Sequence, residues 1–444
     1  MPSVAIELVD AGLVAVREGA VSAPSPGIAL LDPAGVVTGR DAAAQARLKP
    51  VLAFDRFWSD LTTDPLPRRL AEAGSRADLA YLQLSRFWED VAEGGDDALF
   101  VLPGTLRPSE LGLLAGIARA AAVPVAGYLD LAVAACASLE ARETVLHLDV
   151  QMHQAVLTEL HGARMLQRRR VDAAPRVGLR ALYAAWAQLV SESMVRRTRF
   201  DPLHQAATEQ QLYDRLPGWL GQLAAVRSLD VQLETGAGSF SVSLGPEQFV
   251  LAAEAYYAQL FDLIRAARRG DAPVTLVLSA RAATLPQLAE RCLQIPDTEV
   301  VRLEAGAAGL GALAHAGSLT SGQDPALVTA LPRAVPPREA HRPRGAAPTH
   351  VIYAGRAHAL ADGPLTIGLA PETGRSLALA GHAAGISRSH CTLEQGGGVV
   401  RVRDHSRYGT FVNGEKVAGS AELAAGDRLR VGTPGVVLEL VAVS

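Results

Sequence analysis

The chain has 444 residues, of which 49% are hydrophobic and 20% are charged, so it is long enough for roughly two to four domains and too apolar to be disordered. Its 42 basic and 46 acidic side chains give a formal net charge of −4, which excludes attraction to nucleic acid or anionic lipid through overall charge. The chain shows no signal peptide, no apolar run long enough to span a membrane and only three dispersed cysteines, so we expect a cytoplasmic protein with neither a nucleic-acid partner nor a membrane span.

Strands and helices alternate between residues 1 and 330. The hydrophobic patterns predict strands at residues 4–9, 13–19, 27–32, 98–103, 123–129, 143–150, 153–160, 228–234, 239–244, 272–280 and 299–304. Helices are expected at residues 75–93, 177–196, 208–227 and 246–268, and from residues 109, 130 and 285 onward. The run from Arg168 to Arg170 is interpreted as a solvated turn. This order predicts an α/β domain large enough for two lobes.

Residues 331–349 separate this region from the rest of the chain. The segment holds five prolines and four arginines and shows no hydrophobic period. Proline removes backbone donors and biases the preceding residue away from the helix. We therefore predict an exposed and fairly stiff linker.

Residues 350–444 show a different pattern, in which short strands alternate with glycines. Strands are expected at residues 350–355, 365–368, 376–380, 389–395, 399–404, 410–414, 415–419, 427–432 and 436–443. Short strands at regular spacing, with turn residues between them, predict an all-β sandwich. Asn413 and Gly414 predict a two-residue hairpin turn, because both residue types tolerate positive φ.

Three motifs follow one another in this module. Gly385–Cys391 reads G-I-S-R-S-H-C, Asp404–Gly414 reads D-H-S-R-Y-G-T-F-V-N-G, and Leu423–Leu429 reads L-A-A-G-D-R-L. Together they resemble the forkhead-associated (FHA) domain, over residues 350–444. The resemblance implies a β-sandwich whose loops recognise phosphothreonine. The structural positions of the motif would be Gly368, His390, Asp404, Gly409, Thr410 and Gly414.

The resemblance also implies a phosphopeptide site, from which this sequence departs twice. Ser387 takes the position of the serine that bonds the phosphate, and Arg388 either faces the phosphate or lies on the surface. Leu369 replaces the arginine that grips the phosphate, and Tyr408 replaces an asparagine that bonds the ligand backbone. Loss of a charged hydrogen bond costs on the order of 1.5–3 kcal/mol, so weak or phosphate-independent binding is an open alternative. The candidate binding residues are Ser387, Arg388, Tyr408, Asn413 and Arg375, the last as a substitute for the missing arginine.

The order of elements in residues 1–325 resembles the actin/Hsp70 ATPase fold, which has two lobes. The likeness is carried, in order along the chain, by Val4–Ala11, Val125–Ala135, Leu146–Val150, Arg197–Asp201, Phe240–Leu244 and Leu276–Ala280. The first and third of these segments resemble the two phosphate hairpins of that fold. The last resembles the strand beside the adenosine.

The residues that bind nucleotide in that fold are altered here. Such an ATPase needs glycines where backbone N–H groups approach the phosphates, and carboxylates that hold hydrated Mg²⁺. Val9 replaces the glycine of the first hairpin, the glycines expected after Asp149 are absent, and Ser279 begins the altered adenosine loop. His147 and His153 flank Asp149, but strand alternation puts His153 past the turn, so we assign no metal site. We predict a pseudo-ATPase with a vestigial nucleotide site at Glu7, Asp10, Asp130, Asp149 and Ser279.

From the sequence we therefore expect a non-enzymatic adaptor or regulatory scaffold that needs no cofactor. Its partner would be a protein, with phosphothreonine as the candidate mark that the FHA domain recognises. The alternative is an active actin/Hsp70-like ATPase or chaperone that uses ATP and Mg²⁺ and is regulated by its FHA tail. A third hypothesis is an FHA domain that mediates assembly without any dependence on phosphate.

Overall fold

A computed structural model describes residues 3–223, 226–236, 238–268, 272–318, 326–335, 347–371, 374–379, 385–396, 398–413, 415–417, 419–433 and 435–443. The chain divides into two compact units, Met1–Glu339 and Ala340–Ser444. Among the described residues, no helix has both the length and the apolarity that crossing a membrane requires.

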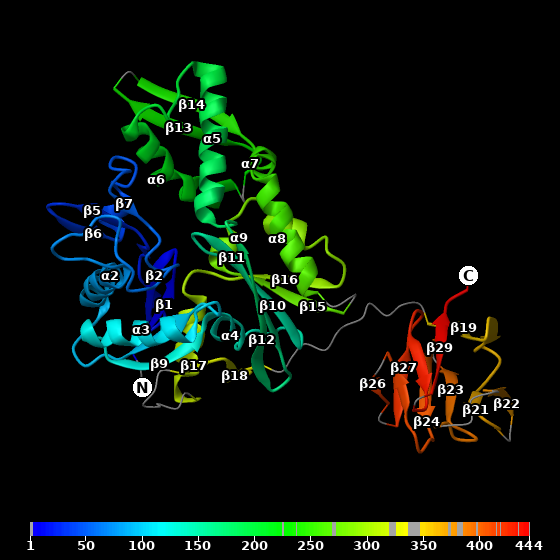
Figure 1. The fold of residues 1–444 in the computed structure, drawn as a ribbon. Coiled ribbons are helices and arrows are strands. Elements are labelled where there is room, and N and C mark those ends of the chain that lie inside the picture. Colours follow the sequence, from blue (N-terminus) through cyan, green and yellow to red (C-terminus); the bar gives the residue numbers. More distant parts are fainter. Residues whose placement is uncertain are drawn as a thin grey trace. The chain divides into compact units, whose positions relative to one another are not determined.

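The N-terminal unit contains a mixed seven-stranded sheet (Figure 1). Its strands are β1 (Val4–Val9), β2 (Gly12–Arg17), β3 (Ala20–Val21), β4 (Ser25–Pro26), β8 (Ala98–Leu102), β9 (Val125–Asp130) and β17 (Leu327–Val328). The order is β17-β9-β8-β1-β2-β3, with β4 paired to β2. β1 and β2 form an antiparallel hairpin, whereas β1, β8, β9 and β17 run parallel.

A six-stranded sheet in the same unit repeats this arrangement. Its order is β16 (Thr298–Arg302), β15 (Val274–Leu278), β10 (Thr144–Val150), β11 (Gln154–His161), β12 (Met165–Pro175) and β18 (Ala330–Pro332). β10 and β11 form the hairpin, and β10, β15 and β16 run parallel. In both sheets, a hairpin therefore has parallel strands beside its first strand, three in the first sheet and two in the second, and an antiparallel strand, β3 or β12, beside its second.

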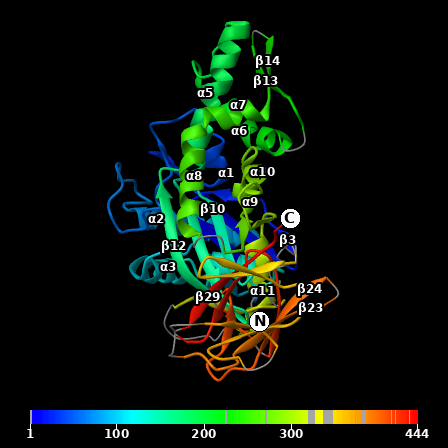
Figure 2. The same cartoon turned by 90° about the vertical axis from the view of Figure 1, so that its right-hand side faces the viewer.

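Helices cover both faces of each sheet, because the central strands are apolar on both faces. α2 (Arg76–Val91) and α3 (Pro108–Ala120) share a core with one face of the first sheet. α4 (Leu131–Cys136) and α11 (Ala307–Ala314) lie in the core between the two sheets. α8 (Glu254–Ala267) packs on the far face of the second sheet (Figure 2), and α5 (Leu179–Thr198) contributes to the core on that side.

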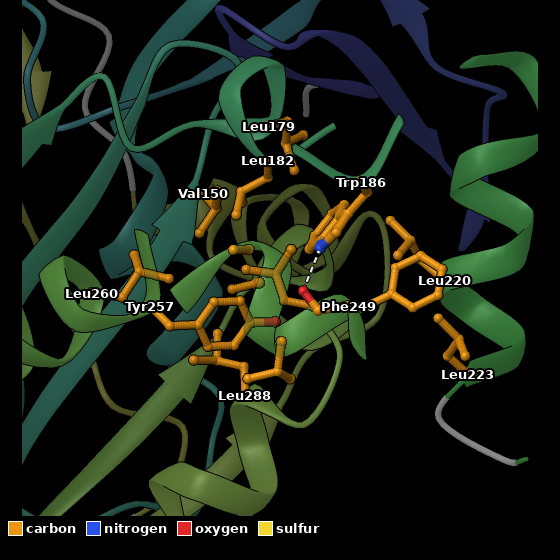
Figure 3. Close-up of a cluster of buried hydrophobic side chains, with 14 of the residues drawn as sticks. Val150, Leu179, Leu182, Trp186, Leu220, Leu223, Phe249, Tyr257, Leu260 and Leu288 are labelled. Atoms are coloured by element: carbon orange, nitrogen blue, oxygen red, sulfur yellow. Dashed lines mark hydrogen bonds between the residues drawn. The ribbon is translucent and has the colours of Figure 1, made fainter. Parts of the chain in front are cut away.

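Smaller elements complete the unit. They are β5 (Ala29–Asp32), β6 (Gly35–Thr38), β7 (Ala53–Phe54), α1 (Arg40–Ala43), α6 (Ala206–Leu223), β13 (Leu229–Thr235), β14 (Gly238–Leu244), α7 (Pro246–Ala252), α9 (Ala280–Ala283), α10 (Leu288–Cys292) and the 3₁₀ turn Ala316–Ser318. β5, β6 and β7 form a small sheet, and β13 pairs with β14. Figure 3 shows the largest core, where the indole N–H of Trp186 donates to the carbonyl of Phe249 at 2.8 Å.

Two elements of the N-terminal unit differ from the sequence prediction. The run Arg168–Arg170 lies inside strand β12 rather than in a turn. Because its side chains are long and polar, this run shows no hydrophobic pattern that would predict a strand. Arg168 Nη1 donates a hydrogen bond to Asp130 Oδ2 at 2.7 Å. The helix predicted at residues 246–268 is interrupted at Ala253, which separates α7 from α8.

Strand β18 carries the N-terminal unit past residue 331, where we expected the linker to begin. Leu331 is buried and lies opposite Leu166 in the sheet. Arg333 then donates to the carbonyls of Ala141 and Arg142, at 3.2 and 2.7 Å. The chain therefore stays attached to the sheet through Arg333, and residues 336–346 of the predicted linker lie outside the described residues.

The C-terminal unit is the predicted all-β sandwich. One sheet has the order β20 (Arg356–Ala359), β19 (His350–Tyr353), β29 (Val436–Val441), β28 (Arg428–Val431), β25 (Thr410–Val412) and β26 (Glu415–Lys416). The other has the order β22 (Arg375–Ala378), β21 (Leu365–Gly368), β23 (Cys391–Gly396), β24 (Val399–Asp404) and β27 (Ser420–Leu423). Alternate residues of both sheets fill one common core.

Candidate functional site

His390 joins two loops at one end of the sandwich. Its Nδ1 accepts the N–H of Ser387 at 3.0 Å, and its Nε2 lies 3.1 Å from the carbonyl oxygen of Gly409. Because Nδ1 is an acceptor, the ring proton lies on Nε2 and the imidazole is neutral. Burial lowers the pKa of His390, in agreement with this neutral form. The ring thus fixes the spacing between the Ser387 loop and the Gly409 turn.

Asp404 shapes the second of these loops. Its Oδ1 accepts from the N–H of Ser406 and the hydroxyl of Thr410, at 3.0 and 2.8 Å. The hydroxyl of Ser406 in turn accepts the N–H of Gly409 at 2.8 Å. Burial would raise the pKa of Asp404, but these hydrogen bonds outweigh it and hold the pKa below its usual value. The loop is therefore rigid, with the two residues after Ser406 at its tip.

Gly368 allows close approach of the Ser387 loop to the sheet. A Cβ at this position would lie 2.0 Å from the carbonyl oxygen of Arg388. Next along the chain, the N–H groups of Leu369 and Ala370 donate to the carbonyls of Ser387 and Arg388, at 3.1 and 3.0 Å. Only glycine leaves room for this contact, which explains the residue at the end of β21.

Ser387 lies where the two loops meet. Its hydroxyl accepts the N–H of Arg407 at 3.3 Å, and the residue is only partly buried. Arg388, Arg407 and Tyr408 beside it are exposed. A phosphate at this junction would meet a hydroxyl and arginine side chains, which are donors that a phosphate dianion prefers. Of the predicted binding residues, Ser387, Arg388 and Tyr408 are thus brought together.

Arg375 lies away from this junction. It begins β22 opposite Leu365, at the start of β21, whereas Gly368, at the end of β21, contacts the Ser387 loop. The guanidinium of Arg375 donates to the carbonyl of Ala359 at 2.5 Å. Three strand residues, roughly 10 Å, separate Arg375 from the loop. It therefore does not replace the missing phosphate arginine.

Asn413 holds a hairpin turn rather than the Ser387 junction. β25 pairs with β26 through Val412 and Glu415, which is the predicted two-residue hairpin, and Asn413 has a φ of 50°. Its Nδ2 donates to Asp427 Oδ1 at 2.8 Å, and its Oδ1 accepts the N–H of Arg428 at 3.0 Å. Asn413 thus contributes to the turn, while Gly414, the predicted structural position after it, lies outside the described residues.

The family comparison agrees with this loop geometry. The family model of the FHA domain matches residues 366–432. The C-terminal sandwich carries an FHA domain. FHA domains are protein-interaction modules that bind phosphoproteins, so the match supports a protein partner. A search of curated proteins with the whole chain found no match.

In the N-terminal unit, Arg281 approaches the predicted vestigial nucleotide residues. Glu7 in β1 and Asp149 in β10 share strand faces with Ala5 and Val145, which contribute to the core between the two sheets. Arg281, in α9, donates to both carboxylate oxygens of Asp149 at 2.9 Å, with a third contact at 3.1 Å. The structure therefore gives Asp149 an internal cationic partner.

Burial acts differently on the two carboxylates of this cluster. Burial raises the pKa of Glu7, whose Oε1 also accepts the N–H of Gly309 at 2.7 Å. Burial would also raise the pKa of Asp149, but the Arg281 guanidinium outweighs it and holds the pKa of Asp149 below its usual value. Asp149 and Arg281 are therefore a buried ion pair, and the environment of Glu7 favours its neutral form.

Asp10 binds backbone N–H groups at the turn between β10 and β11. Its Oδ1 accepts the N–H of Met152 at 2.7 Å, and its Oδ2 accepts the N–H of His153 at 3.0 Å. Burial raises the pKa of Asp10. Successive backbone N–H groups of this kind form an anion site that suits a phosphate. Here the carboxylate of Asp10 occupies the site.

Asp130 and Ser279 begin helices. Asp130 Oδ1 accepts the N–H groups of Ala132 and Val133, at 3.0 and 3.1 Å, while its Oδ2 accepts from Arg168. The hydroxyl of Ser279 accepts the N–H of Ala282 at 3.2 Å. Both residues thus act as N-caps, a structural role that stabilises α4 and α9.

Mg²⁺-nucleotide fits this arrangement poorly. Hydrated Mg²⁺ needs carboxylate oxygens that are available to it and to its waters. Arg281 holds both oxygens of Asp149, and two backbone N–H groups hold those of Asp10. Within the part of the chain that the structure describes, no group of three or more His, Cys, Asp and Glu residues could hold a metal ion.

From the sequence, Arg281 is not predicted as part of the cluster, whereas His147 is considered as a metal ligand and interpreted as a core or turn residue. The position of Arg281, directly after the altered adenosine loop, is a signal in the sequence. Its pairing with Asp149 could not be read from the sequence, because the two residues are 132 positions apart. His147 is buried, and within the described residues its Nε2 has no hydrogen-bond partner. Burial lowers the pKa of His147 to about 4. It is therefore a neutral histidine inside the N-terminal unit at physiological pH.

Proposed function

We propose that the protein is a non-enzymatic adaptor or regulatory scaffold. Its FHA domain recognises a protein partner that carries phosphothreonine. Its N-terminal unit is a pseudo-ATPase of actin/Hsp70-like architecture that offers a second protein-binding surface. The observation that carries the proposal is the exposed junction at Ser387. The neutral ring of His390 fixes the spacing of the two loops there, within the region that matches the FHA domain.

The two sheets of the N-terminal unit support the actin/Hsp70-like part of the proposal. That resemblance implies two related halves, each with a phosphate hairpin. The hairpins β1–β2 and β10–β11 each lie between parallel strands on one side and an antiparallel strand on the other. Glu7 and Asp149 lie near the ends of the equivalent strands β1 and β10.

Two charged side chains inside the N-terminal unit support the proposed loss of ATPase function. The guanidinium of Arg281 neutralises Asp149, where the alternative needs a carboxylate for Mg²⁺. The carboxylate of Asp10 takes the backbone N–H groups that a phosphate would need. Nucleotide would have to displace both groups from a buried site, at the cost of leaving charges unpaired.

Titration calorimetry and peptide retention, both with the full chain, test the two halves of this proposal separately. Mg·ATP at millimolar concentration should give no binding heat, whereas tight binding or turnover would establish the ATPase alternative. A degenerate peptide library with a fixed phosphothreonine should be retained by the chain in preference to the same library with threonine. Equal retention of both libraries would instead support assembly without phosphate.

A further inference from the structure

The FHA domain has lost a cation at a site that needs one. A phosphothreonine carries a charge close to −2 at neutral pH, and it is held most strongly by charge-assisted hydrogen bonds. Leu369 stands where the resemblance expects the gripping arginine. We propose that Arg407 supplies this cation, with its guanidinium on the phosphate that the Ser387 hydroxyl bonds. The inference rests on the proposed phosphopeptide function.

Arg407 is anchored beside Ser387 through its backbone. Its N–H donates to Ser387 Oγ at 3.3 Å, so the Cα of Arg407 is bonded directly to a nitrogen that contacts this hydroxyl. The turn on either side is fixed, because the hydroxyl of Ser406 accepts the N–H of Gly409 and the hydroxyl of Thr433 donates to the carbonyl of Tyr408. A long side chain that starts here reaches any anion bound at Ser387.

The guanidinium of Arg407 is available for such a ligand. The residue is exposed, and within the described residues its side chain makes no hydrogen bond or ion pair. Ser387 and Arg407 therefore present a hydroxyl and a fork of N–H donors from two loops whose spacing His390 fixes. A guanidinium offers the planar, bidentate set of N–H donors that phosphate oxygens accept best.

Three other arginines of the domain are already engaged. Arg375 donates to the carbonyl of Ala359 at the far end of β21 and β22. Arg430 stacks on the ring of Phe411, with its Cζ 3.8 Å from the ring centroid, and donates to the carbonyl of Gly432. Arg388, next to Ser387, already has a partner within the protein.

The experiment compares variants of the full chain on beads that carry the degenerate phosphothreonine library. Arg407→Ala should raise the protein concentration for half-maximal retention roughly tenfold or more, as expected for a lost charged hydrogen bond. Arg407→Lys should lie in between, because lysine keeps the charge but not the planar fork. Arg356→Ala removes the same charge from the exposed edge strand β20 and should leave retention unchanged.

The pH dependence separates phosphate contact from a structural role. Wild-type retention should rise between pH 5.5 and 7, as the phosphate loses its second proton near pH 6, and Arg407→Ala should flatten this rise. If Arg407→Ala behaves like Arg356→Ala while the wild type still prefers phosphothreonine, the Arg407 assignment is wrong and the adaptor proposal stands. If the wild type retains the threonine library equally well, both fail. Unchanged hydrogen exchange over residues 350–444 serves as the folding control.

Discussion

The two candidate sites of this protein differ in where their charges lie. In the N-terminal unit, Asp149 and Arg281 satisfy each other in a buried pair, and Asp10 is held by backbone N–H groups. In the FHA domain, Arg407 and the surface beside Ser387 remain open to solvent. Charges that are paired inside the protein stabilise an arrangement without a ligand, whereas exposed charges can still attract one.

Each candidate site lacks a residue type that its proposed resemblance implies, and the two sites differ in what surrounds that position. At the end of β10 the expected glycines are missing, and an arginine from α9 pairs with the remaining carboxylate. At the end of β21 the expected arginine is missing, but the loops that would hold the ligand keep their hydrogen bonds through His390 and Asp404. The N-terminal cluster is therefore satisfied by contacts within the protein, whereas the FHA loops keep the hydrogen bonds that position them to bind a partner.

The largest expected effect tests the closed site. Arg281→Met leaves the Asp149 carboxylate buried without its cation, so the free energy of unfolding of the N-terminal unit should fall by about 3–5 kcal/mol. Urea unfolding followed by tryptophan fluorescence measures this unit alone, because the four tryptophans of the chain all precede residue 220.

A double variant provides the control for this pair. Asp149→Leu combined with Arg281→Met replaces both charges by apolar groups of similar size and should recover most of the lost stability. If the free energy of unfolding of the single variant Arg281→Met lies within about 1 kcal/mol of the wild-type value, the pair contributes no more than a surface ion pair. That result would show that Asp149 is solvated and that the site is open.

Protonation of His147 tests the same closed site at low pH. Its folded pKa, about 4, lies below the unfolded value of about 6.5, so its contribution to stability is present above pH 6.5 and is lost as the pH falls toward 4. The loss should reach about 3 kcal/mol. Glu7 and Asp10, whose pKa values burial raises, act in the opposite direction.

His147→Leu isolates the histidine from those carboxylates. The variant retains Glu7 and Asp10, so the difference in unfolding free energy between wild type and variant reports on His147 alone. In urea unfolding, the wild type should lose more unfolding free energy than the variant as the pH falls from 7 to 4.5. A pH-independent difference would place the imidazole in contact with solvent.

The sequence could predict the FHA loops better than the N-terminal cluster, because their contacts are local. Asp404 reaches Thr410 six residues along, and His390 reaches Ser387 three residues back, so the motif spacing carries the geometry. Asp149 and Arg281, by contrast, are 132 residues apart, and their contact depends on how β10 and β15 pair in the sheet.

Two elements of the N-terminal unit were missed for compositional reasons. β12 carries consecutive arginines and gives no alternating apolar pattern. α11 contains Gly309 and Gly311 within its eight residues, which lowers its helix propensity. Its glycines are needed for packing, because a Cβ on Gly311 would lie 2.0 Å from the carbonyl oxygen of Ala134 in α4. Tertiary contact thus decides what local sequence cannot.

Gly368→Ala tests the preserved scaffold of the FHA domain. The new Cβ would collide with the carbonyl of Arg388, so we expect a loss of about 2 kcal/mol in the stability of this domain. The Ser387 loop should shift with it and phosphopeptide retention should fall. Hydrogen exchange over residues 350–444 measures the first effect. Gly396→Ala is the matched control, since a Cβ there meets no atom within 4 Å.

The smallest effect separates turn formation from ligand contact in the same domain. Asn413→Gly keeps the positive φ of the hairpin but removes the bonds to Asp427 and to the N–H of Arg428, so hydrogen exchange should show a loss of about 1 kcal/mol. Retention on the phosphothreonine library should not change, because these bonds lie within the turn. Reduced retention with unchanged exchange would return Asn413 to the binding site and move the ligand from the Ser387 junction toward this hairpin.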